Sequence, residues 1–377
     1  MTGKGLRRTR LYDWHVRAGA RMMEFAGWEM PAQYPTGPIE EHQRVRTAAG
    51  LFDIDHMGQL RLSGPDAEAL LQAVQTWDIR RTGVGQAHYT LFCYADGGTV
   101  DDVFLYHLPD HWLIVVNAAN REKDLTWLQA HVGDATVTLE DISEQTYMLA
   151  LQGPQAQTIL QRVTEVDLAR VAFHTIVSGH VAGVPALISA TGYTGEHGYE
   201  LLFPADEAEH VWTTLLRVGE SEGLIPCGLV ARDTLRAEAC LPLYGHEIHA
   251  AIDPISAGLG FAVSFDKGDF IGREALLKVH LEGPQQRLVA FEMVERGVPR
   301  PGYPVVVGGA SVGQVTSGLY SPSTGRYVGM AYVPAAYAAV GTELAIVIHK
   351  QPRAARVVPR PFYRRRQRGE GGEVPRG

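Results

Sequence analysis

The sequence has little cysteine, no long apolar run and no strong charge of either sign. Its 377 residues include three cysteines, Cys93, Cys227 and Cys240, which lie far apart and form no CxxC pair. This spacing argues against a disulfide framework and a cysteine zinc site, and it favours a reducing compartment. No stretch of about 18 apolar residues is present, so we expect no membrane span. The formal net charge of −8 disfavours a dedicated nucleic-acid binder.

Several common catalytic motifs are also absent from the sequence. It contains no GK[ST] phosphate loop, no GxGxxG dinucleotide fingerprint, no GxSxG nucleophile elbow and no protein-kinase motifs. The segment HEIH at 246–249 resembles a zinc motif only superficially, because its histidines are one residue closer together than in HExxH. These absences exclude the common hydrolase, kinase and dehydrogenase classes, and we assign no metal.

The composition predicts a folded chain of two or three domains. Apolar residues make up 45% of the chain and charged residues 20%, which argues against wholesale disorder. Strands and helices alternate up to the polar segment 281–286, where we expect a domain boundary. Beyond it, short β-branched runs between glycine and proline turns predict a small all-β domain. The arginine-rich end, 364–377, has no apolar periodicity and is expected to be a flexible tail.

One predicted hairpin carries the clearest sign of chemistry. In HYTLFCYADGGTVDDVFLYHL, two apolar strands flank an Asp-Gly-Gly turn, which is typical of a β-hairpin. A two-residue turn places Leu91 opposite Asp102. Because side chains alternate along a strand, Asp102 then shares one face with Tyr89 and Tyr106, whereas Asp101 points to the other face.

A carboxylate inside the apolar run VDDVFLY is unusual, because a half-buried acid loses hydration unless a donor replaces the water. Desolvation raises the pKa of a carboxyl group, and neighbouring tyrosine hydroxyls can lower that pKa or orient a ligand. Such a group suits acid or base chemistry on a bound nitrogen. The alternative is structural, in which the two aspartates cap the turn and its edge strand.

A second segment, TGYTGEHGYELLF, has three glycines spaced three residues apart. They predict a close bend with Tyr193 on one side and Glu200 on the other. Glu200 begins an apolar strand, where its carboxylate can receive two donors from a planar heterocycle. The alternative is a structural hairpin without a ligand.

A third segment, CGLVARDTLRAEACLPLYG, predicts a helix. Arg232 and Arg236 are four residues apart, so they share a helix face and could together form a fork for a carboxylate. The alternative is that the arginines make internal ion pairs with Asp233 or Glu238.

Taken together, these segments resemble the aminomethyltransferase of the glycine cleavage system, the T-protein family, across nearly the whole chain. The resemblance rests on FAGWEMPAQY, GLFDIDHMG, GGTVDDVFLY, VVNAANREKD, LQGPQAQ, TGYTGEHGYE, PCGLVARDTLRAEA, LYGHEI, DFIGREAL and GQVTSGLYSP. It implies an α+β fold with three domains in a clover-leaf arrangement around a central folate channel, ending in a small C-terminal β-barrel-like domain. The implied domains are residues 1–50 with 141–240, residues 51–140 with 241–280, and residues 285–363.

The resemblance also implies an activity. The enzyme would take the aminomethyl group from the lipoyl arm of the H-protein and pass its carbon to tetrahydrofolate, giving 5,10-methylenetetrahydrofolate, ammonia and dihydrolipoyl H-protein. Asp102 matches the family's catalytic aspartate, in agreement with the strand parity. No nucleic acid or membrane partner is implied. The implied folate-binding residues are Tyr89, Tyr106, Asn117, Tyr193, Glu200 and Arg232. The expected compartment is the cytoplasm, or the mitochondrial matrix if a presequence has been removed.

Three positions depart from the family pattern. Asp55 stands where the family usually has serine, Val230 where it has glycine, and Ala237 where it has leucine. None of these changes removes an implied catalytic group. Asp55 adds a carboxylate near a segment that lines the interior in this family.

Two related functions remain as alternatives. One is a standalone folate-dependent demethylase of the same superfamily, whose folate contacts would look alike. The other is a non-catalytic folate-binding protein of the branch linked to iron–sulfur cluster assembly. That branch carries a cysteine in KGCYxGQE, whereas this chain reads KGDFIGRE, with Asp269 in place of the cysteine. This difference and the intact GGxxDD segment count against the second alternative.

Overall fold

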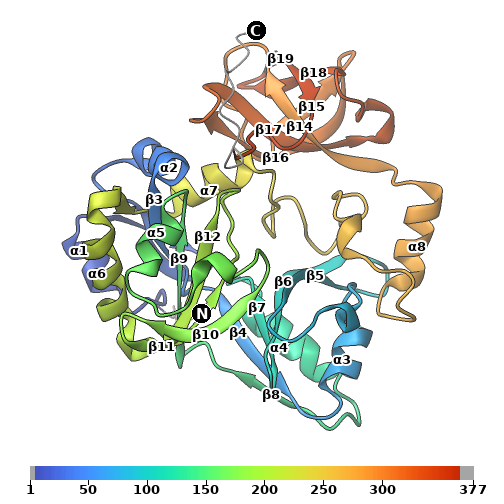
Figure 1. Cartoon of the computed structure of the whole chain (residues 1–377). Coiled ribbons are helices and arrows are strands. Elements are labelled where there is room, and N and C mark those ends of the chain that lie inside the picture. The colour runs from blue at the N-terminus through green and yellow to red at the C-terminus, as the bar shows by residue number, and fades with distance from the viewer. Residues whose placement is uncertain (1–4, 366–377) are drawn as a thin grey trace.

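The computed structural model describes residues 5–365, and the chain forms three lobes (Figure 1). A six-stranded sheet, a five-stranded sheet and a closed six-stranded barrel form their centres. The predicted α+β class and C-terminal barrel are confirmed. Within the described range, no helix is long and apolar enough to cross a bilayer. The predicted tail at 364–377 lies, from residue 366 onward, outside the described residues.

The first lobe is built on the six-stranded sheet, in the order β10-β11-β12-β9-β3-β13, with only β13 parallel to its neighbour. Its strands are β3 (Ala49–Asp53), β9 (Thr146–Gln152), β10 (Ile176–Val181), β11 (Val184–Ser189), β12 (Gly198–Pro204) and β13 (Leu224–Pro226). A separate hairpin is formed by β1 (Arg21–Phe25) and β2 (Trp28–Gln33), and the helices are α1 (Tyr12–Arg17), α2 (Pro38–Thr47), α5 (Ala156–Gln161), α6 (Ala208–Gly219) and α7 (Leu229–Glu238). The leucines on one face of the sheet are buried against α5 and α6. Trp212, on α6, is fully buried in this core.

The second lobe contains the antiparallel five-stranded sheet, in the order β5-β6-β7-β4-β8. Its strands are β4 (Gly58–Ser63), β5 (Ala87–Cys93), β6 (Thr99–His107), β7 (Trp112–Val116) and β8 (Thr138–Asp141), and α3 (Ala67–Val74) and α4 (Arg121–Ala130) complete the lobe. The apolar side chains of α3 and α4 share one core with one face of this sheet. The other face shares a second core with the first lobe, in which Tyr106 and Val115 lie with Phe52, Met148 and Leu235. The two sheets therefore meet through a common core.

The third lobe is the closed barrel, in the order β14-β17-β16-β15-β18-β19. Helix α8 (Arg273–Glu282) precedes it, and its strands are β14 (Gln286–Met293), β15 (Pro304–Val307), β16 (Ala310–Ser321), β17 (Arg326–Pro334), β18 (Glu343–Ile348) and β19 (Gln351–Val358). Short 3₁₀ turns elsewhere are η1 (Ile79–Arg81), η2 (Leu168–Arg170), η3 (Ala205–Glu207), η4 (Glu220–Glu222), η5 (Gly260–Ala262) and η6 (Ala335–Tyr337). β-branched residues fill the barrel, because alternate side chains of every strand point inward.

The strands of the first two sheets are interleaved along the chain. The limits of the three implied domains stay a prediction. All five residues of β3 pair within the six-stranded sheet, so this strand lies across the limit predicted at residue 50. Residues 54–57 then separate β3 from β4, which belongs to the other sheet. The chain therefore crosses between the two sheets within a few residues.

The β5–β6 hairpin has the register predicted from its parity, but not the predicted turn. Leu91 pairs with Asp102. The register shifts after Phe92, and the turn closes with the backbone N–H of Gly97 donating to the carbonyl of Tyr94 at 2.9 Å. The prediction of a two-residue turn is therefore wrong. The predicted faces of the two strands are still correct, because the register shifts only after Phe92, on the turn side of the pair formed by Leu91 and Asp102.

We expect Gly98→Ala to destabilise the protein. A Cβ at this position would lie 1.9 Å from the carbonyl oxygen of Ala250, so the hairpin tip would have to move away from the loop that it contacts. Overpacking of this kind costs about 1–3 kcal/mol, which calorimetry would record as a lower melting temperature. Gly83→Ala is the matched control, because its nearest neighbour is 3.5 Å away. Equal melting temperatures for the two variants would contradict the close contact.

Candidate active site

Asp102 lies on β6 and is held by the side chains of Tyr89, on the neighbouring β5, and Asn117, which directly follows β7. The hydroxyl of Tyr89 donates to Oδ2 at 3.0 Å, and Nδ2 of Asn117 donates to Oδ1 at 2.7 Å. Asp102 is partly exposed, whereas Asp101 is fully buried on the opposite face of the strand. The predicted side of each aspartate is confirmed, and Asp102 is the one that a ligand can reach.

The environment of Asp102 favours its protonated form more than water does. Burial raises the pKa of this carboxyl above its ordinary range, and the nearby Asp101 carboxyl raises it further. The hydrogen bonds from Tyr89 and Asn117 act in the opposite direction, because they stabilise the carboxylate. A carboxyl group with a raised pKa can both accept and return a proton near neutral pH.

Glu200, on β12, offers a half-satisfied carboxylate to the same region. Its Oε2 accepts from Thr191 Oγ1 at 2.5 Å and from the hydroxyl of Tyr106 at 3.3 Å. Its Oε1 has no hydrogen-bond partner within residues 5–365. One oxygen therefore fixes the side chain, while the other is open to a donor from a ligand.

The glycines before Glu200 allow a close approach of the backbone. A Cβ on Gly192 or Gly198 would come within 2.0 and 2.4 Å, respectively, of the side chain of Gln152. Nε2 of Gln152 in turn donates to the carbonyl of Thr191 at 3.1 Å. Only Gly195, with a φ of +80°, has a backbone conformation that favours glycine. Gly192 and Gly198 thus allow close packing on Gln152, and Gly195 allows the predicted bend.

Arg232 and Tyr193 form the third part of the site. The guanidinium of Arg232 lies 4.8 Å from the centre of the Tyr193 ring, and the Tyr193 hydroxyl donates to the carbonyl of Pro242. Arg232 is partly exposed and has no hydrogen-bond or ion-pair partner in the described part of the chain. Burial lowers its pKa, while the charge of Glu200 opposes this change. An unpaired guanidinium beside a ring suits an anionic or aromatic ligand.

The fork predicted from Arg232 and Arg236 does not form. Arg236 is 1% exposed and turns into the protein, where it pairs with Asp233 and Glu247 at 2.8 Å each. The structural alternative is therefore correct for Arg236, although Glu247 replaces the expected Glu238. The helical spacing could not separate these outcomes, because Glu247 comes from a distant loop.

The structure brings the seven predicted site residues to the region where the two sheets and α7 meet. Tyr89 and Asn117 hold Asp102, and Tyr106 holds Glu200. Both groups lie near the Arg232–Tyr193 pair, since the charge of Asp102 raises the pKa of Tyr193 and the charge of Glu200 raises that of Arg232. Their individual roles stay predictions.

Sequence reasoning missed the supporting residues of this region. Thr191 and Gln152 fix Glu200 and its bend, yet neither is singled out by a motif. Asn120 and Asp124 lie behind Asp102 and follow Asn117 in NAANREKD. The spacing of three and four residues along a helix was the signal that could have identified them.

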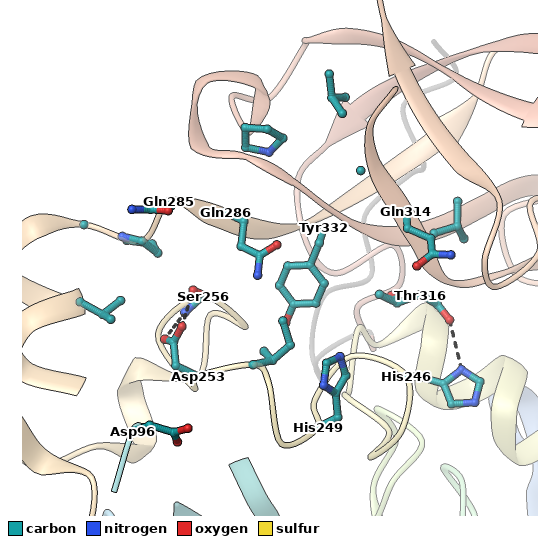
Figure 2. A pocket seen from close by; sticks show the side chains of 18 of the residues that line it. Asp96, His246, His249, Asp253, Ser256, Gln285, Gln286, Gln314, Thr316 and Tyr332 are labelled. Atoms are coloured by element: carbon teal, nitrogen blue, oxygen red, sulfur yellow. Dashed lines mark hydrogen bonds between the residues drawn. The ribbon is translucent and has the colours of Figure 1, made fainter. Parts of the chain in front are cut away.

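A cavity with a volume of about 1130 Å³ lies elsewhere in the described chain. It opens between α8, the loop 245–256 and the barrel, where Tyr332, Gln314 and Gln286 point inward (Figure 2). None of the seven predicted site residues lines it. Within the described range, no group of three or more histidine, cysteine, aspartate and glutamate side chains could hold a metal ion.

Comparison with known proteins gives one family over nearly the whole chain. Residues 11–267 match the GCVT N-terminal domain, and residues 286–364 match the glycine cleavage T-protein C-terminal barrel domain. The chain is 50% identical to the aminomethyltransferases of Desulforamulus reducens and Symbiobacterium thermophilum, covering 96% of this chain and 99% and 98% of those proteins. The crystal structure of the glycine cleavage system aminomethyltransferase T from Bartonella henselae matches with a TM-score of 0.90 at 33% identity, covering 96% of this chain and 99% of that one.

The mixed fold with its C-terminal barrel is that of a group-transfer enzyme of known structure. The chain belongs to the glycine cleavage T-protein family, and it is an enzyme of the aminomethyltransferase type.

We expect Asp55→Asn to stabilise the protein, and to do so more as pH rises. Asp55 is 9% exposed, and burial followed by the charge of Asp53 raises its pKa to about 9. The folded state therefore binds this proton more tightly than the unfolded state, so stability falls between the ordinary pKa and about 9. Asparagine does not titrate, and its side-chain oxygen can still accept from the N–H of Met148.

Melting temperatures at about pH 5 and about pH 8 would test this prediction, with a gain of several degrees expected at the higher pH. The exposed Asp134→Asn is the control and should change neither value. A gain at about pH 5 that equals or exceeds the gain at about pH 8 would contradict a raised pKa at Asp55.

Proposed function

We propose that the enzyme takes the aminomethyl group from a lipoylated H-protein and transfers its carbon to tetrahydrofolate. The products are 5,10-methylenetetrahydrofolate, ammonia and the dihydrolipoyl H-protein. The carbon–sulfur and carbon–nitrogen bonds of the aminomethyl group break, and two bonds to folate nitrogens form. The observation that carries this proposal is the carboxyl of Asp102, held by Tyr89 and Asn117 and given a raised pKa.

In this proposal Asp102 is the catalytic residue. Its carboxylate accepts a hydrogen bond from the amine that becomes bonded to carbon, and so orients and polarises that amine. The raised pKa allows Asp102 to take up the proton that the amine loses and to pass it on toward the leaving ammonia or sulfur. Tyr89 and Asn117 keep the carboxylate in one orientation throughout.

Glu200 and Arg232 are proposed to bind the folate. A carboxylate with one open oxygen matches the adjacent N–H donors on the edge of a pterin ring, and Tyr106 and Thr191 hold it in place. Arg232, unpaired within the described residues, offers a cation beside the Tyr193 ring. These groups fit a planar, nitrogen-rich ligand that also carries negative charge.

The partner and the acceptor can be tested together. Incubation of the purified enzyme with aminomethyl-loaded H-protein and tetrahydrofolate should release ammonia and form one equivalent of methylenetetrahydrofolate. Omission of tetrahydrofolate is the control, and it should reduce ammonia release by at least tenfold. Without ammonia release in the complete mixture, the aminomethyl proposal fails. Transfer of a methyl group from a methyl sulfide or an aryl methyl ether to tetrahydrofolate, giving 5-methyltetrahydrofolate and the free thiol or phenol, would instead support the demethylase alternative.

Asp102→Asn should lower turnover by a factor on the order of 10² or more, because it removes a proton-transferring group but retains the shape. Tetrahydrofolate binding, measured by calorimetry, should change by less than about threefold. Asp110→Asn is the matched control, since this aspartate lies in the turn between β6 and β7 and its side chain is 68% exposed. Turnover of Asp102→Asn equal to that of the control would eliminate Asp102 as the catalytic residue.

A further inference from the structure

Two further carboxyl groups lie behind Asp102, on the opposite face of β6. Asp101 follows Val100 on the strand, and Asp124 lies in the first turn of α4, which packs against that face. Both residues have 0% of their surface exposed. Each acts on the protonation of its neighbours, since the charge of Asp101 raises the pKa of both Asp102 and Asp124.

Asp101 is well supplied with donors. Its Oδ1 accepts from Nδ2 of Asn117 at 2.9 Å and from Nδ2 of Asn120 at 2.6 Å. Its Oδ2 accepts from the backbone N–H of Asn117 at 3.1 Å. Three N–H groups therefore stabilise the ionised form of this carboxyl, even though it is fully buried.

Asp124 has the opposite environment. No N–H or O–H group of residues 5–365 donates to either of its carboxyl oxygens, although both are buried. Its immediate side-chain partner is the Asp101 carboxyl. The ammonium group of the neighbouring Lys123 makes its hydrogen bonds to other groups, since its Nζ donates to the carbonyl of Val100 and to the hydroxyl of Tyr244. An ionised Asp124 would be a buried charge with no donor, which proteins avoid by protonation.

Two buried carboxylates in contact repel each other, so the pair holds one proton. Its location follows from the donors: Asp101 already accepts three N–H groups, whereas Asp124 accepts none. A protonated Asp124 has an O–H to donate, and Asp101 has a lone pair on Oδ2 to receive it. This arrangement satisfies both residues with one negative charge in place of two.

We propose that Asp124 is a carboxylic acid that donates its proton to the Asp101 carboxylate, and that this pair is a positioning device for Asp102. Asn117 is the connecting residue, because its Nδ2 contacts both Asp101 Oδ1 at 2.9 Å and Asp102 Oδ1 at 2.7 Å. A fixed Asp101 therefore fixes the amide that holds Asp102. The expected effect on turnover depends on the proposed catalytic role of Asp102. The protonation of Asp124 does not depend on that role.

The other groups around the pair leave this assignment unchanged. On the Asp102 side, the hydroxyl of Tyr89 donates to Asp102, and Tyr193 lies near it with a raised pKa, so both phenols are neutral. On the helix side, Tyr244 also has a raised pKa and is neutral, and Lys123 is the one cation that acts on Asp124 among the causes of its shift. Asp101 and Asp102 are the carboxylates among the main causes of the raised pKa of Asp124.

Infrared spectroscopy tests the proton directly. In D₂O at mildly alkaline pH, the wild-type protein should show a carboxylic-acid C=O band from Asp124, separate from the carboxylate bands, that is lost in Asp124→Asn. Asp55, whose pKa is raised to about 9, absorbs in the same region, and its contribution should remain in both spectra. Glu122→Gln, which changes a side chain that is 83% exposed on the same helix, should retain the band. If the wild-type and Asp124→Asn spectra coincide in this region, Asp124 is ionised and the proposal is overturned. This outcome does not depend on which residue is catalytic.

The pH dependence of turnover tests the positioning. Asp124→Leu removes the donor to Asp101, so the hold of Asn117 on Asp102 weakens. We expect about a tenfold lower kcat, an unchanged KM for tetrahydrofolate, and an acid limb of the kcat profile that moves to higher pH. Asp124→Asn keeps a donor at this place and should restore both kcat and the position of the limb.

Two kinetic outcomes would overturn the positioning role. An acid limb that moves to lower pH in Asp124→Asn would mean that a negative charge had been removed, and so that Asp124 was ionised. Equal kcat values and profiles for Asp124→Leu and wild type would show that the pair does not act on Asp102. Should Asp124→Leu fail to fold, the Asp124→Asn profile and its infrared spectrum still decide the proposal. Failure of the proposed function is recognised separately, by a wild-type enzyme that releases no ammonia.

Discussion

Buried carboxylates supplied with donors from more than one lobe hold this structure together. Glu238, on α7, has no exposed surface, and its oxygens accept from Arg46 of α2 and from Ser321 of the barrel. Glu247 is also fully buried and accepts from Thr316 of the barrel, while it pairs with Arg236 of α7. Removing one partner from such a group leaves an uncompensated charge, at a cost of about 3–5 kcal/mol. The positions of the lobes are therefore specified by where these acids find their donors.

The same constraint marks two groups of the candidate site. Most buried acids within residues 5–365 have donors for both oxygens. In the same range, the partly exposed Glu200 leaves Oε1 open, and the side chain of Arg232 has no hydrogen-bond or ion-pair partner. Asp102 is held by two donors and keeps an accessible side, with a pKa that burial raises. Groups that a fold leaves incompletely satisfied are those that a ligand can complete.

Much of the fold and part of the site could be predicted from local pattern. The period of two along β6 separated Asp102 from Asp101 correctly, because alternation needs no knowledge of distant contacts. The length of the turn was not predictable, since its tip packs on the backbone of Ala250 from a loop far along the chain. The helix face with Arg232 and Arg236 was identified, but the partner of Arg236 is Glu247, which no spacing rule could indicate. The motifs indicated the family, which the matches over residues 11–267 and 286–364 confirm. The roles of individual residues depend on tertiary contacts that no motif specifies.

The sequence by itself determined which residues alternate, where glycine permits a bend, and that a β-rich segment ends the chain, because these depend on spacing and composition. The tertiary structure decided which charges are neutralised and which remain available. Asp101 and Asp102 are chemically identical neighbours, yet one faces α4 and three N–H donors while the other faces the region of Tyr89 and Tyr193. That difference arises from the elements packed on each side of a single strand, and the proton affinity of a carboxyl group depends on those surroundings.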